Sequence, residues 1–168
     1  MNYHGIENDS MLNGDGIRVC LWCSGCDHHC KNCHNPQTWD KNGGMLFDKK
    51  AEEQLFLDLD KDYVSGVTFT GGDPLNENNV ETILHLCEEF RSKFGSTKTI
   101  WIYSGYYLND IMERKNAKDD IRIKILRLAD VFVDGPFIQE LADVNYPHAG
   151  STNQNVIVLK NIWKEETV

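Results

Sequence analysis

The sequence predicts an α/β fold built on a parallel sheet, and three observations support this. Short segments rich in β-branched and aromatic residues recur along the chain, and apolar positions with helical spacing lie between them. From Thr68 onward the centres of the segments are about 30 residues apart. Strands that alternate with helices of about 10–15 residues are typical of βαβ units. The 168 residues fit one domain, residues 1–168. A complete eight-unit barrel needs about 250 residues, so about five or six units fit this length.

The expected elements follow in chain order from these two patterns. Strands are predicted at residues 17–22, 67–70, 99–103, 131–133 and 156–159. Apolar residues three or four apart share one face of a helix, and this spacing predicts a helix in each of three intervening stretches. Their apolar positions are Ala51, Leu55 and Leu59; Val80, Ile83, Leu84, Cys87 and Phe90; and Ile121, Ile125 and Leu128.

Three of the expected strands end in polar or glycine-rich segments. These segments are Gly71-Gly72-Asp73-Pro74, Ser104-Gly105 and Asp134-Gly135-Pro136. Turn formation alone accounts for such residues, because Gly, Asp and Pro dominate turns. In parallel α/β sheets, however, ligands bind beyond the carboxyl ends of the strands. The repetition of these segments along one edge therefore favours a binding site there.

The charge balance excludes some classes of partner. The chain has 17 Lys and Arg against 26 Asp and Glu, a formal net charge of −9. Nucleic-acid-binding proteins carry basic patches, and no Lys/Arg cluster of that kind is present, so no nucleic-acid partner is expected. No apolar run approaches the roughly 18 residues of a membrane helix. The first residues also lack the basic and apolar regions of a signal peptide. We therefore expect a cytoplasmic protein without a membrane partner.

Most of the cysteines are crowded into one short stretch. Of six, Cys20, Cys23, Cys26, Cys30 and Cys33 fall within 14 consecutive residues. In a reducing compartment such crowding indicates metal or redox chemistry rather than disulfides. The spacing allows a three-thiolate set, Cys26-x3-Cys30-x2-Cys33, and a ferredoxin-like set that runs from Cys20 to Cys30. It also allows two Cys-x2-Cys pairs that hold zinc, or thiols that in part ligate nothing.

These alternatives differ in their support. Lys31 follows Cys30 where the bacterial ferredoxin loop carries Pro, and the chain has no second motif of this kind. Zinc pairs are usually separated by about a dozen residues or more, and here they lie closer together. Cys20 falls in an apolar strand, where a thiol acts as a small hydrophobe. Three thiolates on a [4Fe–4S] cluster leave one iron open, as chemistry on a substrate requires.

With these motifs in view, the chain resembles the radical S-adenosylmethionine (SAM) superfamily. Within it, the chain looks most like the small activating proteins of anaerobic ribonucleoside-triphosphate reductase. The matching stretches are residues 13–18, 24–36 with 38–39, 70–75, 103–106, 133–137 and 150–154. Asn32 stands where many members have an aromatic or apolar residue, and Asp15 where Pro is common. The resemblance implies an open, incomplete (βα)5-6 parallel barrel of the radical SAM type.

The resemblance also implies a set of site residues. Cys26, Cys30 and Cys33 would ligate one [4Fe–4S] cluster per chain, and the methionyl amine and carboxylate of SAM would bind its open iron. Contacts with SAM are implied for Asn32, Cys33, His34, Gly71, Gly72, Asp73 and Ser104. The carboxylate of Asp73 would accept a hydrogen bond from the methionyl ammonium. No catalytic side chain is expected beyond the cluster and SAM.

The implied reaction is the activation of a glycyl-radical enzyme. An electron from a low-potential flavodoxin- or ferredoxin-like donor would cleave SAM to methionine and a 5′-deoxyadenosyl radical. That radical would take the α-hydrogen from a glycine of the large catalytic subunit of anaerobic ribonucleoside-triphosphate reductase. The rival functions are a ferredoxin-like electron carrier that uses Cys20, Cys23, Cys26 and Cys30, and a zinc-stabilised interaction module.

The sequence supports simpler predictions for several further residues. His28 and His29 are expected to be polar residues of an exposed loop rather than metal ligands. We expect Cys20 and Cys23 to be inert, and Cys87 to lie in the core because it falls on an apolar helical face. Asp134 is characteristic of the family and ends a strand, where a turn cap explains it at least as well as a binding role. Asn153 and Gln154 are characteristic of the family, without an assigned contact.

Overall fold

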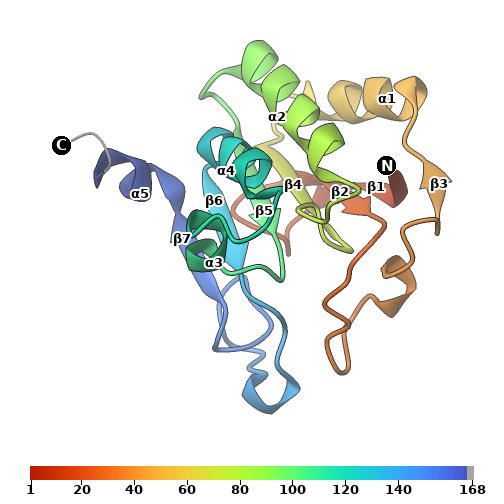
Figure 1. Cartoon of the computed structure of the whole chain (residues 1–168). Coiled ribbons are helices and arrows are strands. Elements are labelled where there is room, and N and C mark those ends of the chain that lie inside the picture. Colours follow the sequence, from red (N-terminus) through yellow and green to blue (C-terminus); the bar gives the residue numbers. More distant parts are fainter. Residues whose placement is uncertain (166–168) are drawn as a thin grey trace.

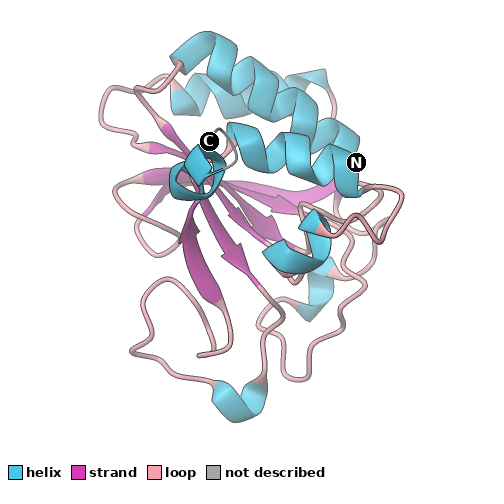
Figure 2. Cartoon of the chain, turned by 60° about the vertical axis from the view of Figure 1, so that its left-hand side comes forward, coloured by secondary structure: helices cyan, strands magenta, loops and turns pink. Residues whose placement is uncertain are grey.

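The computed structural model describes residues 1–165, and Figures 1 and 2 show one sheet with helices gathered on one side. Within this range the sheet has seven strands in the order β3-β1-β2-β4-β5-β6-β7. The strands are β1 (Asn2–Ser10), β2 (Arg18–Cys23), β3 (Met45–Leu46), β4 (Gly66–Gly71), β5 (Thr99–Tyr103), β6 (Val131–Asp134) and β7 (Asn155–Val158). β2, β4, β5 and β6 are parallel to one another. The predicted α/β class is confirmed.

The three long helices lie where apolar spacing predicted them. The helices are α1 (Lys49–Leu59), α2 (Val80–Phe94), α3 (Leu108–Met112), α4 (Asp119–Leu128) and α5 (Leu159–Glu165), with 3-10 turns at Pro36–Thr38 and Gln139–Leu141. The sequence pattern did not predict α3 and α5, because each is too short to show a repeating apolar face. Among the helices that the structure describes, none combines the length and apolar character needed to cross a membrane.

The prediction that all the strands are parallel is wrong at the edges of the sheet. The strand predicted at residues 156–159 is β7, and it pairs with β6 in antiparallel fashion. A parallel return needs a crossover, usually a helix, that carries the chain back along the sheet. Residues 135–154 form no such helix, so the chain turns back at the carboxyl end of β6. β1 and β3, also antiparallel, were not predicted, because the β1 segment NYHGIENDS is largely polar.

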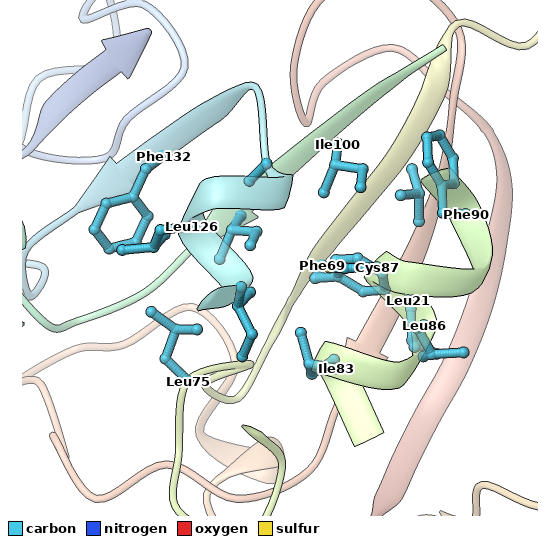
Figure 3. Close-up of a cluster of buried hydrophobic side chains, with 14 of the residues drawn as sticks. Leu21, Phe69, Leu75, Ile83, Leu86, Cys87, Phe90, Ile100, Leu126 and Phe132 are labelled. Carbon is cyan, nitrogen blue, oxygen red and sulfur yellow. The ribbon is translucent and has the colours of Figure 1, made fainter. Parts of the chain in front are cut away.

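The hydrophobic core lies between the sheet and its helices, because successive strand residues point to opposite faces. Leu21, Phe69 and Ile100, on neighbouring parallel strands, point toward the helices and are at most 1% exposed. Figure 3 shows these side chains close to Cys87 and Phe90 of α2. Cys87 is 0% exposed, which confirms its prediction as a core residue.

The opposite face of the parallel strands carries polar and aromatic side chains. Arg18 of β2 is fully buried there, and its guanidinium donates to Thr68 Oγ1 (2.7 Å) and to the backbone oxygens of Val67 (2.7 Å) and Thr99 (2.9 Å). It also lies 5.5 Å from the ring centroid of Trp101. Burial lowers the pKa of Arg18 to about 10, so the side chain remains charged at neutral pH. Arg18 therefore joins β2, β4 and β5 through side-chain bonds as well as through the sheet.

Replacing Phe69 by alanine is expected to lower the free energy of unfolding by about 3–5 kcal/mol, since the change removes a buried ring and leaves a cavity. Denaturant titration under anaerobic conditions measures this loss. Leu57→Ala is the control, because Leu57 lies on α1 with 64% of its surface exposed. Its effect is expected to stay within about 0.5 kcal/mol. Equal losses for the two variants would contradict the assignment of Phe69 to the core.

Candidate functional site

A cavity of about 490 Å³ lies beyond the carboxyl ends of the parallel strands. It is bordered by the cysteine loop (residues 24–40), the loop that begins at the end of β4 (residues 71–79, the β4 loop), the loop after β5 (residues 104–107, the β5 loop) and the β6–β7 loop (residues 135–154). Figure 1 shows the cysteine loop in orange and the β6–β7 loop in blue, both extending from the same end of the sheet. The volume lies within the range of small-molecule sites, about 300–1,000 Å³.

The six cysteines divide into two groups. Cys26, Cys30 and Cys33 are partly exposed and line the cavity. Cys20 and Cys23 are both 0% exposed and lie on β2 at positions that point to opposite faces of the strand. Cys23 belongs to the hydrophobic core. One metal centre therefore cannot take both Cys20 and Cys23 together with the cavity cysteines, which argues against the ferredoxin-like set and against a zinc pair formed by these two.

Backbone N–H groups reach the sulfurs of the cavity cysteines. The amide of Asn35 donates to Cys33 Sγ at 3.4 Å, and the backbone at His28 and Phe137 lies close enough to Cys26 and Cys30 to lower the pKa of each thiol against the larger effect of burial. Hydrogen bonds of this kind stabilise sulfur ligands and tune iron–sulfur clusters. The donor set therefore fits a thiolate-bound cluster.

Metal binding by these cysteines depends on pH, because the protein favours the protonated form of their thiols. Burial, with a further contribution from the charge of Asp73, raises the pKa of Cys26 to about 12. Burial also raises the pKa of Cys30. In the absence of a metal both groups are thiols at neutral pH, and a metal must displace their protons to bind.

Gly71 and Gly72 form the cavity wall at the end of β4, and neither position has room for a side chain. Gly71 has φ +104°, and a Cβ there would lie 2.7 Å from the backbone nitrogen of Cys23. A Cβ on Gly72 would lie 2.7 Å from the backbone oxygen of Gly25 and 2.9 Å from that of Thr38. The backbone at this point is therefore in direct contact with β2 and with the cysteine loop.

The carboxylate of Asp73 joins three of the loops. Its Oδ1 accepts from the Leu75 amide at 2.8 Å. Its Oδ2 lies 2.7 Å from Nε2 of His28 and accepts from Ser104 Oγ (3.0 Å) and from the Gly105 amide (3.1 Å). Asp73 is 1% exposed and is not among the described residues that line the cavity. Its bonds in this structure are thus made within the protein, and its contact with the SAM ammonium stays a prediction.

The remaining predicted SAM contacts lie in different surroundings. Cys33, His34 and Ser104 line the cavity. The hydroxyl of Ser104 donates to Asp73 and accepts from the Tyr106 amide at 3.2 Å. Asn32 is exposed in the cysteine loop with φ +57°, and the structure does not bring it to the cavity. The roles of these residues toward SAM also stay predictions.

His28 is not the exposed loop residue that the sequence predicted. Its side chain is 20% exposed and bonds to Asp73. The two residues are 45 positions apart, so no local pattern signals their contact. His29 is exposed, as predicted, and its ring centroid lies 4.7 Å from that of Trp39.

Other cavity residues were also absent from the prediction. Trp22, Tyr103, Phe137, Tyr146 and His148 all line the cavity. The sequence did contain a signal for Trp22 and Tyr103, because strand alternation places them on the face of β2 and β5 opposite the core-facing residues. The last three come from the β6–β7 loop, whose course the sequence pattern does not reveal.

Residues at the two ends of the β6–β7 loop hold it in place. Asp134 accepts from the Leu108 amide at the start of α3 (2.9 Å) and from the Asn155 amide (3.2 Å), so its side chain links β6 to α3 and β7. The side-chain amide of Gln154 donates to the carbonyl of Gly135 (2.9 Å). The side-chain amide of Asn153 donates to the carbonyl of Pro136 (2.8 Å). These side chains therefore support the cavity wall.

Comparison with known protein families identifies the class of site. The model of the 4Fe-4S single cluster domain matches residues 12–157, most of the chain. The match includes the cysteine loop, the glycines at the end of β4 and the β6–β7 loop. The fold and the cavity cysteines thus define a protein with a 4Fe-4S single cluster domain.

Curated relatives narrow this class. The anaerobic ribonucleoside-triphosphate reductase-activating proteins of Haemophilus influenzae and Escherichia coli K12 are each 38% identical to the chain, over 156 and 158 residues. These matches cover 92% and 93% of this chain, and 96% and 97% of the relatives. The activating protein of Enterobacteria phage T4 is 34% identical over 99% of this chain and 100% of its own length. The chain belongs to this family of anaerobic ribonucleoside-triphosphate reductase-activating proteins.

Gly72→Ala is expected to destabilise the protein by about 1–3 kcal/mol, because the added methyl would press on backbone oxygens that have little freedom to move. Thermal unfolding of the wild type and the variant measures the loss. Gly5→Ala in β1 is the matched control, since no atom lies within 4 Å of its added Cβ. Similar melting temperatures for Gly72→Ala and Gly5→Ala would contradict the close packing at the end of β4.

Proposed function

We propose that this chain is a radical SAM enzyme that activates anaerobic ribonucleoside-triphosphate reductase. It would generate a glycyl radical on the reductase through reductive cleavage of SAM at a [4Fe–4S] cluster. The observation that carries the proposal is the convergence of Cys26, Cys30 and Cys33 with Gly71 and Gly72 around one cavity. No other cysteine of the described chain lines that cavity, so three thiolates leave one iron of a cluster for SAM.

The proposal gives the protein's own residues a binding and orienting role. Cys26, Cys30 and Cys33 hold the cluster, and the N–H groups at their sulfurs stabilise its negative charge. When bound and reduced, the cluster supplies the electron that cleaves SAM to methionine and a 5′-deoxyadenosyl radical. The backbone of Gly71 and Gly72 receives the methionyl end of SAM, and the surrounding cavity wall restricts water.

We also interpret the sheet as an open, incomplete barrel of the radical SAM type. The helices cover one side of the sheet, and the cavity lies at the carboxyl ends of its parallel strands. The cysteine loop and the β6–β7 loop border the cavity. An open side of such a barrel lets a glycine on a large protein substrate reach the radical.

The proposed partner is the large catalytic subunit of anaerobic ribonucleoside-triphosphate reductase. The names of the relatives support this partner, since they are activating proteins of that enzyme. We propose a flavodoxin- or ferredoxin-like protein of low potential as the electron donor. Free cysteines around a cluster suit a reducing compartment, so we propose a cytoplasmic location.

The cysteine ligands are testable by substitution. Alanine at Cys26, Cys30 or Cys33 is expected to remove most of the iron, because each variant loses one of only three thiolates. Cys20→Ala and Cys87→Ala are matched controls that keep about four irons per chain. Iron, sulfide and zinc analysis after anaerobic reconstitution makes the measurement. Loss of the cluster in Cys20→Ala would favour the electron carrier, and stoichiometric zinc without iron would favour the interaction module.

The reaction itself is testable by electron paramagnetic resonance. Adding SAM to the reduced wild-type protein is expected to change the cluster signal, because SAM binds the open iron. Adding the cognate reductase as well is expected to give a glycine-centred radical signal, and removal of iron with a chelator abolishes both effects. A cluster signal that does not respond to SAM would contradict the proposed function. A response to SAM without a glycine radical would contradict the proposed partner.

A further inference from the structure

Two successive residues after the first cavity cysteine bond to the β4 loop. Asp27 Oδ2 accepts from the side-chain amide of Asn76 at 2.8 Å, and His28 Nε2 lies 2.7 Å from Asp73 Oδ2. Both partners in the β4 loop are 1% exposed. The segment that follows Cys26 is therefore attached to a buried part of the neighbouring loop by side chains rather than by a strand ladder.

The ring of His28 is also held from the side of the β5 loop. Its centroid lies 4.7 Å from that of Tyr106, in an edge-on arrangement. The guanidinium of Arg122, which is 0% exposed, lies 4.0 Å from the Tyr106 centroid and supports that ring from α4. A Cβ on Gly105 would collide with the ring of His28, so the glycine leaves the space that the imidazole fills. These contacts fix the orientation of His28 toward Asp73.

We propose that His28 is a positioning residue for SAM. The Gly72 and Asp73 amides already donate to the carbonyls of Cys23 and Gly25, which fixes the start of the cysteine loop against the β4 loop. By bonding to Asp73, His28 holds the segment after Cys26 in place as well, and so keeps the cluster ligands in position relative to the backbone of Gly71 and Gly72. This inference rests on the proposed function.

The two parts of the cofactor site depend differently on this bond. The cluster ligands all lie in one loop, which can wrap a cluster without help from β4. SAM, in contrast, has to meet the open iron and the Gly71–Gly72 backbone at the same time. The binding of SAM is therefore the property that requires the two loops to be in register, and the loss of the His28–Asp73 bond should weaken it selectively.

Direct metal binding by His28 is the competing role. Donor atoms of Cys26, His28 and Asp73 lie within 4.8 Å of one another, close enough to surround one ion. In this structure, however, Nε2 of His28 is engaged by the carboxylate of Asp73. A ligand role would therefore have to use Nδ1, and it predicts loss of metal when His28 is replaced.

The test compares His28→Ala and His28→Gln with the wild type, with His29→Ala as the matched control. His29 lies in the same loop, but its ring is exposed and makes no contact with Asp73 that the structure describes. Iron per chain is measured after anaerobic reconstitution. The dissociation constant for SAM is measured by equilibrium dialysis and by titration of the cluster signal in the reduced protein.

The expected result separates cluster content from SAM binding. All variants keep the wild-type iron content, and His28→Ala binds SAM at least about tenfold more weakly, as the loss of a hydrogen bond to a carboxylate implies. His28→Gln stays within about threefold of the wild type, because its side-chain amide also donates over this distance and glutamine is a poor iron ligand. His29→Ala binds SAM like the wild type.

The other possible results distinguish the inference from a ligand role for His28 and from failure of the proposed function. SAM affinity in His28→Ala equal to that of the wild type would overturn the inference and leave the proposed function intact. Loss of iron in both His28 variants, with His29→Ala unaffected, would overturn it in favour of a metal ligand. If His28→Ala loses iron while His28→Gln keeps both iron and SAM binding, the hydrogen bond is supported. A wild-type protein that holds a cluster but does not bind SAM would refute the proposed function itself.

Discussion

The buried carboxylate of Asp73 is the interaction on which the arrangement of the site depends. A carboxylate with 1% exposure is costly unless donors satisfy it. Its donors are His28 in the cysteine loop, Ser104 and Gly105 in the β5 loop, and Leu75 in its own turn. Because these donors come from separate loops, the loops must converge to satisfy one charge. The cavity forms beside the point where they meet.

Strand alternation determines which cysteines reach that cavity. Cys20 and Cys23 lie on β2, where the two-residue period sends them to opposite faces and both become fully buried. Cys26, Cys30 and Cys33 follow the end of the strand, where the chain is free to turn toward the cavity. Crowding along the sequence therefore does not mean crowding in space. The cysteines within β2 are thus buried structural thiols, and those after its end are the candidate ligands.

The antiparallel return of β7 supplies the opposite wall of the cavity. Because the chain does not cross over after β6, residues 135–154 remain at the carboxyl end of the sheet and bring Phe137 and Tyr146 to the cavity. Asp134 and Gln154 hold the ends of this loop. The chain thus uses a long loop where a further strand and helix would otherwise stand, which is compatible with a large protein as the proposed substrate.

The sequence by itself determined the strands and helices of the parallel core. Apolar periodicity is a local signal, and burial of the apolar face then stabilises each element. The sequence also singled out Cys26, Cys30 and Cys33 by their spacing, and Gly71 and Gly72 as a strand-end motif. Tertiary structure alone decided the direction of β7, the burial of Asp73 and its contact with His28. The physical reason is distance along the chain: a hydrogen bond between residues 45 positions apart leaves no periodic trace in either segment. It arises only when the folded sheet brings the two loops together.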